Sequence, residues 1–92
     1  MFDYDLSDDL KESVAKLLKK DPVMASALKK KMDEITACDE TEIEHYPDSS
    51  YQCAGAKHVH IASSFVLFFR VFRKEKHVRF LAIMHHDKAF RR

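Results

Sequence analysis

Residues 65–84, FVLFFRVFRKEKHVRFLAIM, decide the fold, because two apolar runs flank a segment of charged residues. The first run, 65–72, is almost continuously apolar, which is typical of a strand that is buried on both faces. Residues 73–76 are all charged, and such a segment between two strand-like runs predicts the tip of a β-hairpin. The second run, 77–84, is the returning strand. These residues therefore predict the centre of an antiparallel sheet.

A further strand is predicted just upstream, over residues 57–63. Apolar and polar residues alternate there, so Val59 and Ile61 are expected on one face of the strand and His58 and His60 on the other. Residues 37–56 show no periodicity and predict an irregular connection, with a short strand near residues 42–46. A connection of this length in a small protein is usually functional or mobile.

The N-terminal part predicts a short edge strand over residues 2–6 followed by two helices. Ser7 is a plausible N-cap for the first helix, which ends near Lys20, and Asp21-Pro22 is a typical helix start. Two helices with so short a connection should form an antiparallel hairpin. The predicted fold class is α+β, with the order β-α-α-β-β-β and the helical hairpin on one face of a mainly antiparallel sheet. Residues 1–92 are expected to form a single domain.

Composition excludes several classes of protein. The chain has 92 residues, of which 46% are hydrophobic and 34% charged, a balance typical of soluble globular domains. A single glycine excludes the Gly-rich phosphate loops. No apolar run approaches the roughly 20 residues of a membrane span, and no secretory leader opens the chain. The prediction is a cytoplasmic protein without a membrane partner, in which Cys38 and Cys53 are free thiols.

Charge is distributed unevenly along the chain. Residues 1–50 hold 7 Lys and Arg against 13 Asp and Glu, a net charge of −6, whereas residues 51–92 hold 9 against 2, a net charge of +7. Such an asymmetry bears on binding partners rather than on fold. The basic half suggests a polyanionic partner, with phosphates as the groups that its lysines and arginines would neutralise.

The histidines are the strongest candidates for chemistry. If the strands pair in order, His85, His86, Asp87 and Phe90 should come near His58 and His60. Histidine titrates near neutral pH, so a group of them can exchange protons with a substrate. A metal site is the competing use of the same imidazoles and carboxylate, although nearby lysines and arginines would repel a dication. Phe90 lies beyond the predicted strands and could stack on a base.

These residues resemble the RelE/ParE toxin superfamily, and most closely its YafQ-like and archaeal RelE-like branches. The resemblance rests on His45-Tyr46, on His58-Val59-His60-Ile61, and on His86 with Phe90 four residues later, in matching order. It covers about residues 43–92 by motif and the helical hairpin by architecture. Val66 stands where several RelE enzymes carry arginine, and Ser64 where the YafQ-like branch has an acidic residue.

The resemblance implies a toxin that is a metal-independent endoribonuclease without a cofactor. It would cleave mRNA, in association with the ribosome, and a cognate antitoxin would silence it. The implied catalytic residues are His45, His60 and His86, which would act as general acid and base. The resemblance implies that Lys57 and His58 stabilise the charge that develops on the phosphate, and that Phe90 holds or stacks the base. Further candidate substrate-binding residues are Ser64, His85 and Arg91. Two alternatives stay open: a non-catalytic ParE-like toxin that binds a protein such as gyrase, and a His-rich metal-binding module.

Overall fold

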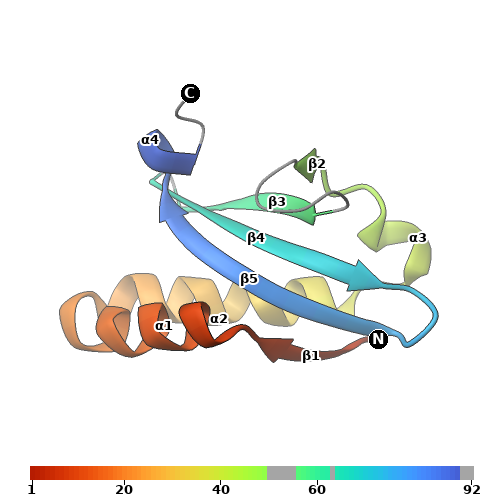
Figure 1. Ribbon diagram of the computed structural model, residues 1–92, viewed down its shortest axis with the longest axis horizontal. Helices are drawn as coiled ribbons and strands as arrows, with labels where there is room; N and C mark the ends of the chain where they lie inside the picture. The colour runs from red at the N-terminus through yellow and green to blue at the C-terminus, as the bar shows by residue number, and fades with distance from the viewer. Residues whose placement is uncertain (50–55, 63, 90–92) are drawn as a thin grey trace.

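The structure is a computed structural model, and it describes residues 1–49, 56–62 and 64–89 (Figure 1). The chain runs through four helices and five strands in these ranges: β1 (Asp3–Leu6), α1 (Asp8–Lys20), α2 (Pro22–Ala37), α3 (Glu40–Ile43), β2 (Asp48–Ser49), β3 (Ala56–Ile61), β4 (Phe65–Phe72), β5 (His77–His85) and α4 (His86–Ala89). Helices α1 and α2 lie together along one face of the sheet, while α4 lies on the other side, at the end of β5 (Figure 1). The predicted α+β class is confirmed.

The sheet has the order β1-β5-β4-β3-β2. Strand β1 pairs with β5 in parallel, and the other neighbours are antiparallel. The hairpin predicted from residues 65–84 is therefore the centre of the sheet, with Phe72 paired to His77 across its tip. The edge position of β1 is confirmed as well.

The helical hairpin forms where the sequence predicts it. The Ser7 hydroxyl accepts a hydrogen bond from the Leu10 amide at 3.1 Å and donates one to the Leu81 carbonyl at 2.6 Å, so this residue both caps α1 and fastens it to β5. Asp21 caps α2 by accepting from the Met24 amide at 3.1 Å, and Pro22 occupies the first turn. These caps satisfy amides that the first turn of a helix leaves without partners.

The connection after α2 differs from the prediction. The short strand expected near residues 42–46 is wrong: residues 40–43 are helical, and the strand is β2, at Asp48–Ser49. The physical reason is a capping box, in which the Asp39 side chain accepts from the Glu42 amide at 2.8 Å and the Glu42 side chain accepts from the Asp39 amide at 3.0 Å. These reciprocal bonds stabilise a helical turn.

The core lies between the sheet and the helical hairpin. Ile61, Leu67, Phe69 and Phe80 from the sheet pack in one cluster with residues of the two helices, among them Leu28. Strand alternation places the neighbours of these residues on the opposite face, which we call the outer face: 58 and 60 on β3, 66, 68, 70 and 72 on β4, and 77, 79, 82 and 84 on β5. In β4, Val66, Leu67, Phe68 and Phe69 all have 0% exposure, so the predicted burial on both faces holds for these four residues, whereas Arg70 on the outer face is exposed.

Cys38 is a free thiol, and Cys53 lies outside the described residues. None of the helices in residues 1–49, 56–62 and 64–89 has the length and apolar character of a membrane-spanning segment.

Candidate functional site

Three histidines meet on the outer face of the sheet. His58 and His60 lie on alternate positions of β3, and their ring centroids are 6.2 Å apart. The ring of His60 stacks on that of His86, with a centroid distance of 5.5 Å and an angle of 29° between the planes. His60 and His86 are both exposed, so a ligand has access to this group, which we call the histidine cluster.

The position of His86 is fixed by its backbone. It is the first residue of α4, where the chain leaves β5, and its amide donates a hydrogen bond to the Ser64 carbonyl at 2.7 Å. Ser64 precedes β4, so this bond holds the start of β4 against the end of β5. Ser64 was predicted to bind substrate, and in the structure its carbonyl anchors His86.

The three rings differ in their surroundings. Burial lowers the pKa of His58, and the neighbouring His60 lowers it further. A lowered pKa favours the neutral form of imidazole at neutral pH. His58 therefore suits the role of an uncharged hydrogen-bonding group, rather than the cationic phosphate ligand that the resemblance implies. His60 and His86, which are more exposed, are the pair that can exchange protons with a bound molecule.

His85 does not join the cluster. It pairs with Phe65 across β4 and β5, and the two rings make an edge-to-face contact at 5.6 Å. Phe65 packs against the core on the helical side, so His85 faces the opposite side of the sheet from His86. The prediction that His85 shares the face of the other histidines is wrong, because successive residues at a strand end point to opposite faces.

His45 also lies apart from the cluster. It is an exposed residue in the turn between α3 and β2, where its amide donates to the Glu42 carbonyl at 3.1 Å. In the part of the chain that the structure describes, the ring of His45 makes none of the contacts that join His58, His60 and His86. Of the three implied catalytic residues, the structure therefore brings together His60 and His86, while His45 lies apart from them.

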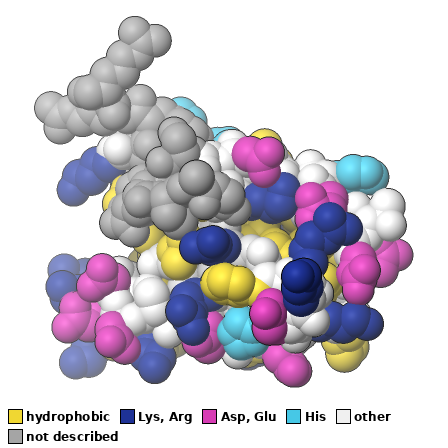
Figure 2. All heavy atoms as spheres, turned by 45° about the vertical axis from the view of Figure 1, so that its right-hand side comes forward, with side chains coloured by type: hydrophobic (Ala, Val, Ile, Leu, Met, Phe, Trp, Pro, Cys, Tyr) yellow, Lys and Arg dark blue, Asp and Glu magenta, His cyan; other side chains and the backbone are white. Residues whose placement is uncertain are grey.

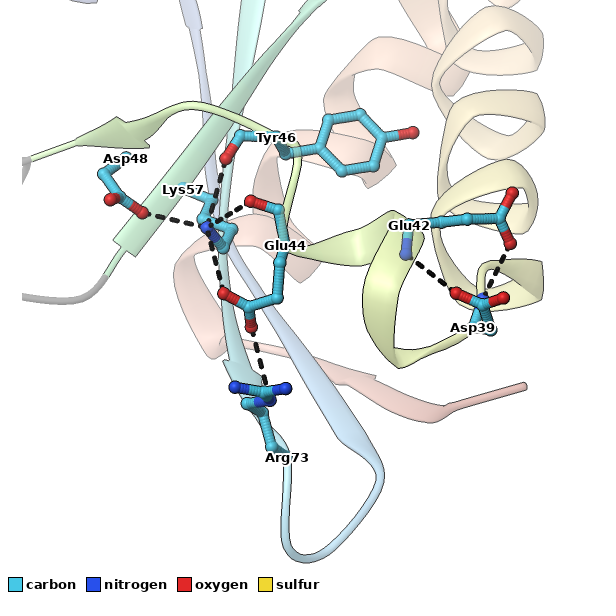
Figure 3. Close-up of polar contacts among 7 residues, drawn as sticks. All are labelled: Asp39, Glu42, Glu44, Tyr46, Asp48, Lys57 and Arg73. Atoms are coloured by element: carbon cyan, nitrogen blue, oxygen red, sulfur yellow. Dashed lines mark hydrogen bonds and ion pairs between the residues drawn. The ribbon is translucent and has the colours of Figure 1, made fainter.

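Lys57 has a different position from the one the sequence predicts (Figure 3). It alternates with His58 and lies on the helical side, where its side chain is only 8% exposed. Its ammonium donates to the carboxylate of Asp48 at 2.9 Å and to the carbonyls of Tyr46 at 3.1 Å and Glu44 at 3.4 Å. These partners occupy the donors of Lys57, and the lysine fastens the turn that carries His45 to β3.

Two predicted substrate-binding residues, Phe90 and Arg91, lie outside the described residues. In the described ranges, no group of three or more His, Cys, Asp and Glu side chains is placed to hold a metal ion. The alternative of a His-rich metal-binding module therefore has no preformed ligand set in that part of the chain.

The uneven charge of the chain is largely balanced within the fold. Cationic residues of the second half form ion pairs with acidic residues of the first half: Lys57 with Asp48, Arg73 with Glu44, Lys76 with Glu40 and Arg79 with Asp5. Figure 2 shows basic and acidic side chains lying side by side on one side of the molecule. The basic half is therefore not a uniformly basic surface, because the two halves of the chain neutralise one another.

Arg70 is a residue of the outer face that the sequence does not distinguish from the other basic residues of the second half. It is a single charge in the apolar run of β4, and it is exposed on the outer face, on the same side as His60. Apart from its place among the basic residues, the only sequence signal was its even spacing from Phe68 and Phe72, which marks the outer face.

Comparison with known proteins places this fold among the small α+β toxins. No protein-family model matches the chain. It is 34% identical to a protein of Methanocaldococcus jannaschii named "Putative toxin RelE4", over all of this chain and 94% of that protein. The YoeB/ParE toxin from Agrobacterium tumefaciens has a TM-score of 0.75 at 9% identity, covering 92% of this chain and 99% of the toxin. The toxin–antitoxin complex RelBE2 from Mycobacterium tuberculosis includes a chain with a TM-score of 0.71 at 13% identity, covering 92% of this chain and 98% of that one.

The two solved structures show the fold, and the archaeal relative shows the family. The chain belongs to the RelE/ParE superfamily of toxins. The resemblance inferred from the histidine motifs and the helical hairpin is confirmed.

Proposed function

We propose that this toxin is an endoribonuclease that cleaves mRNA by histidine acid–base catalysis. The observation that supports the proposal most directly is the stacked pair of His60 and His86 on the accessible outer face, 5.5 Å apart. Two exposed imidazoles at this separation can each reach a different oxygen of one phosphodiester that binds along their edges. The substrate supplies its own nucleophile, the ribose 2′-hydroxyl, so the protein has to supply proton transfer and charge stabilisation.

In the proposed mechanism, one ring of the pair is neutral and the other is protonated. The neutral imidazole takes the proton from the 2′-hydroxyl as that oxygen attacks the adjacent phosphorus. The protonated imidazole donates its proton to the 5′-oxygen as the P–O bond to that oxygen breaks. The products are a 2′,3′-cyclic phosphate and a free 5′-hydroxyl, and a rate that needs one neutral and one protonated ring has a bell-shaped pH profile.

The neighbouring residues have supporting roles in this proposal. Neutral His58 packs beside His60 without adding charge to the cluster, and the Ser64 carbonyl keeps His86 in place. His45 takes part if RNA binding brings its turn toward the pair. Phe90 keeps the base-stacking role that the resemblance implies, and Arg91 stays a candidate for substrate binding.

The test compares RNA cleavage by the wild-type protein with that of His60→Ala and His86→Ala, with and without ribosomes and in the presence of EDTA. Each substitution should lower the cleavage rate by about 10²–10⁴-fold, the usual contribution of a general acid or base. Lys16→Ala is the control, because Lys16 is exposed on α1, which lies on the opposite face of the sheet from the histidine cluster. Full activity in both alanine variants rules out the mechanism, and growth arrest with intact mRNA supports a gyrase-binding toxin instead.

We propose further that a cognate antitoxin masks this toxin, because an RNA-cleaving protein must be silenced in the cell that makes it. The RelBE2 structure from M. tuberculosis, which shares the fold, is a toxin–antitoxin complex. The test is co-expression with the product of an adjacent gene: that product should co-purify with the toxin and restore growth.

A further inference from the structure

We propose that the outer face carries a second RNA-binding subsite, formed by Arg70, Phe72, His77 and Arg79. This inference rests on the proposed function and deepens it, since it says where the protein binds the part of the RNA that lies away from the cleaved bond. The four residues form a square block on two neighbouring strands, because Arg70 pairs with Arg79 and Phe72 with His77.

The block combines cationic and aromatic groups. The guanidinium carbon of Arg70 lies 5.1 Å from the centre of the Phe72 ring, and that of Arg79 lies 5.9 Å from it. The Phe72 and His77 rings have their centroids 6.3 Å apart. Nucleic-acid bases stack on such aromatic and guanidinium planes, and arginine also binds phosphate.

Two arginines directly opposite each other destabilise a sheet, so their placement needs an explanation. Asp5 neutralises one of them: its carboxylate accepts from Arg79 Nε and Nη2, both at 3.1 Å. Arg70 has no carboxylate partner within the described ranges and is exposed. An anionic ligand would complete the pairing of charges, because it would do for Arg70 what Asp5 does for Arg79.

A shallow depression of about 290 Å³ adjoins the block and is lined by Phe72, Glu75, His77 and Arg79. Its volume is near the lower end of small-ligand sites. Glu75 on its rim repels phosphate, so the phosphate belongs at Arg70 and the base over Phe72 and His77. This arrangement fits one nucleotide of a single strand.

The subsite lies in line with the histidine cluster. His60 pairs with Val66 on β4, and Arg70 is four residues further along the same strand and on the same face, a distance of about 13 Å at 3.3 Å per residue. That distance corresponds to about four nucleotides at a stacked rise of 3.4 Å. One RNA strand can thus contact the histidine cluster and the second subsite together.

The test uses fluorescent single-stranded RNA in which 2′-O-methyl groups prevent cleavage, in lengths of two and twelve nucleotides. Arg70→Ala should weaken binding of the twelve-nucleotide RNA roughly tenfold, the effect of losing a phosphate contact and part of a stack, and leave binding of the dinucleotide unchanged. Phe72→Leu, which keeps an apolar side chain, should also weaken binding of the longer RNA only. Lys16→Ala is the control, because Lys16 is an exposed cation on α1, on the other face of the sheet.

Each result bears on one of the two proposals. If wild-type protein cleaves RNA and Arg70→Ala binds the twelve-nucleotide RNA as tightly as Lys16→Ala does, the second subsite is wrong and the nuclease proposal stands. If Arg70→Ala loses affinity for RNA but wild type cleaves nothing, the subsite stands without the nuclease. If Arg70→Ala loses affinity for an acidic antitoxin peptide and not for RNA, the block is a protein-binding surface and the proposal is overturned.

Discussion

At the scale of single residues, Lys57 shows how a strand position changes the meaning of a side chain. The basic residue beside His58 fits a phosphate ligand in the sequence, but strand alternation places it on the helical side, where Asp48 and two carbonyls accept hydrogen bonds from its ammonium (Figure 3). An ammonium with these partners is a structural group, because few of its donors are left for a ligand.

We therefore expect Lys57→Met to lower the free energy of unfolding by about 1–3 kcal/mol, the usual effect of leaving buried polar groups without partners. Urea denaturation measures this, with Lys74→Met as the control at an exposed position. A variant with unchanged stability and a loss of RNA cleavage of a hundredfold or more would restore Lys57 as a phosphate ligand.

The backbone of Lys76 has an unfavourable conformation for a residue other than glycine. It ends the β4–β5 turn with a φ of 50°, a left-handed conformation that costs a residue with a Cβ roughly 1–2 kcal/mol. Glycine lacks this cost but loses more entropy on folding. We expect Lys76→Gly to raise the free energy of unfolding by up to about 1 kcal/mol in thermal denaturation. Lys74→Gly in the same turn, where φ is not positive, should give no gain, and an equal gain in both variants contradicts this explanation.

At the scale of elements, the side chain of Asp5 on β1 adds to the pairing with β5, because its carboxylate contacts Arg79 and His77. The hydrogen bonds from Arg79, and then the contact with His77, lower the pKa of Asp5 from its ordinary value of 3.8 to about 2. The folded protein therefore binds this proton less readily than the unfolded chain. The stabilising contribution is complete above pH 3.8 and is lost as the pH falls through about 2.

We expect Asp5→Asn to be less stable than wild type at pH 5 by less than about 1 kcal/mol, because Asp5 is partly exposed and such pairs are screened by solvent. The difference should shrink as the pH falls below 4 and vanish near pH 2. Urea denaturation across this range measures it. Asp3→Asn is the control on the same strand, and a difference between Asp5→Asn and wild type that is constant with pH would show that Asp5 acts through something other than its charge.

The elements also show what the sequence could and could not predict. Strong periodicity and local caps such as Ser7 and Asp21 placed β1, both long helices and the β4–β5 hairpin correctly. The turn of α3 was missed because its four residues are too few to show a helical period, and its capping box involves Asp39 and Glu42 alone.

Only part of the candidate site could be predicted, because some of its contacts leave no periodic pattern in the sequence. The contact between His60 and His86 follows from β3, β4 and β5 pairing in order, and the sequence indicated that order. The separation of His85 from His86 depends on where β5 ends, and strand ends are the least certain part of a sequence-based prediction. The anchoring of Lys57 depends on the path of residues 44–48, for which the sequence shows no period.

At the scale of the whole molecule, the balance of charge limits how the protein can hold RNA. Ion pairs between the two halves of the chain use four cations of the basic half, from Lys57 to Arg79. Within the described ranges, the cations of that half without a carboxylate partner are Arg70, Lys74 and Lys88. Binding of RNA should therefore depend on a small number of phosphate contacts and on stacking, rather than on a broad basic surface.

The salt dependence of RNA binding measures that number. For single strands, the logarithm of the binding constant falls with the logarithm of salt concentration with a slope of about −0.7 per phosphate contacted. Three such cations give a slope of about −2, five with Arg91 and Arg92 give about −3.5, and engagement of all nine basic residues of residues 51–92 gives about −6. We expect a slope between about −2 and −3.5 for the twelve-nucleotide RNA, and a smaller slope for Arg70→Ala. A slope near −6 means that RNA breaks the ion pairs between the two halves, since only then are all nine cations available to phosphate.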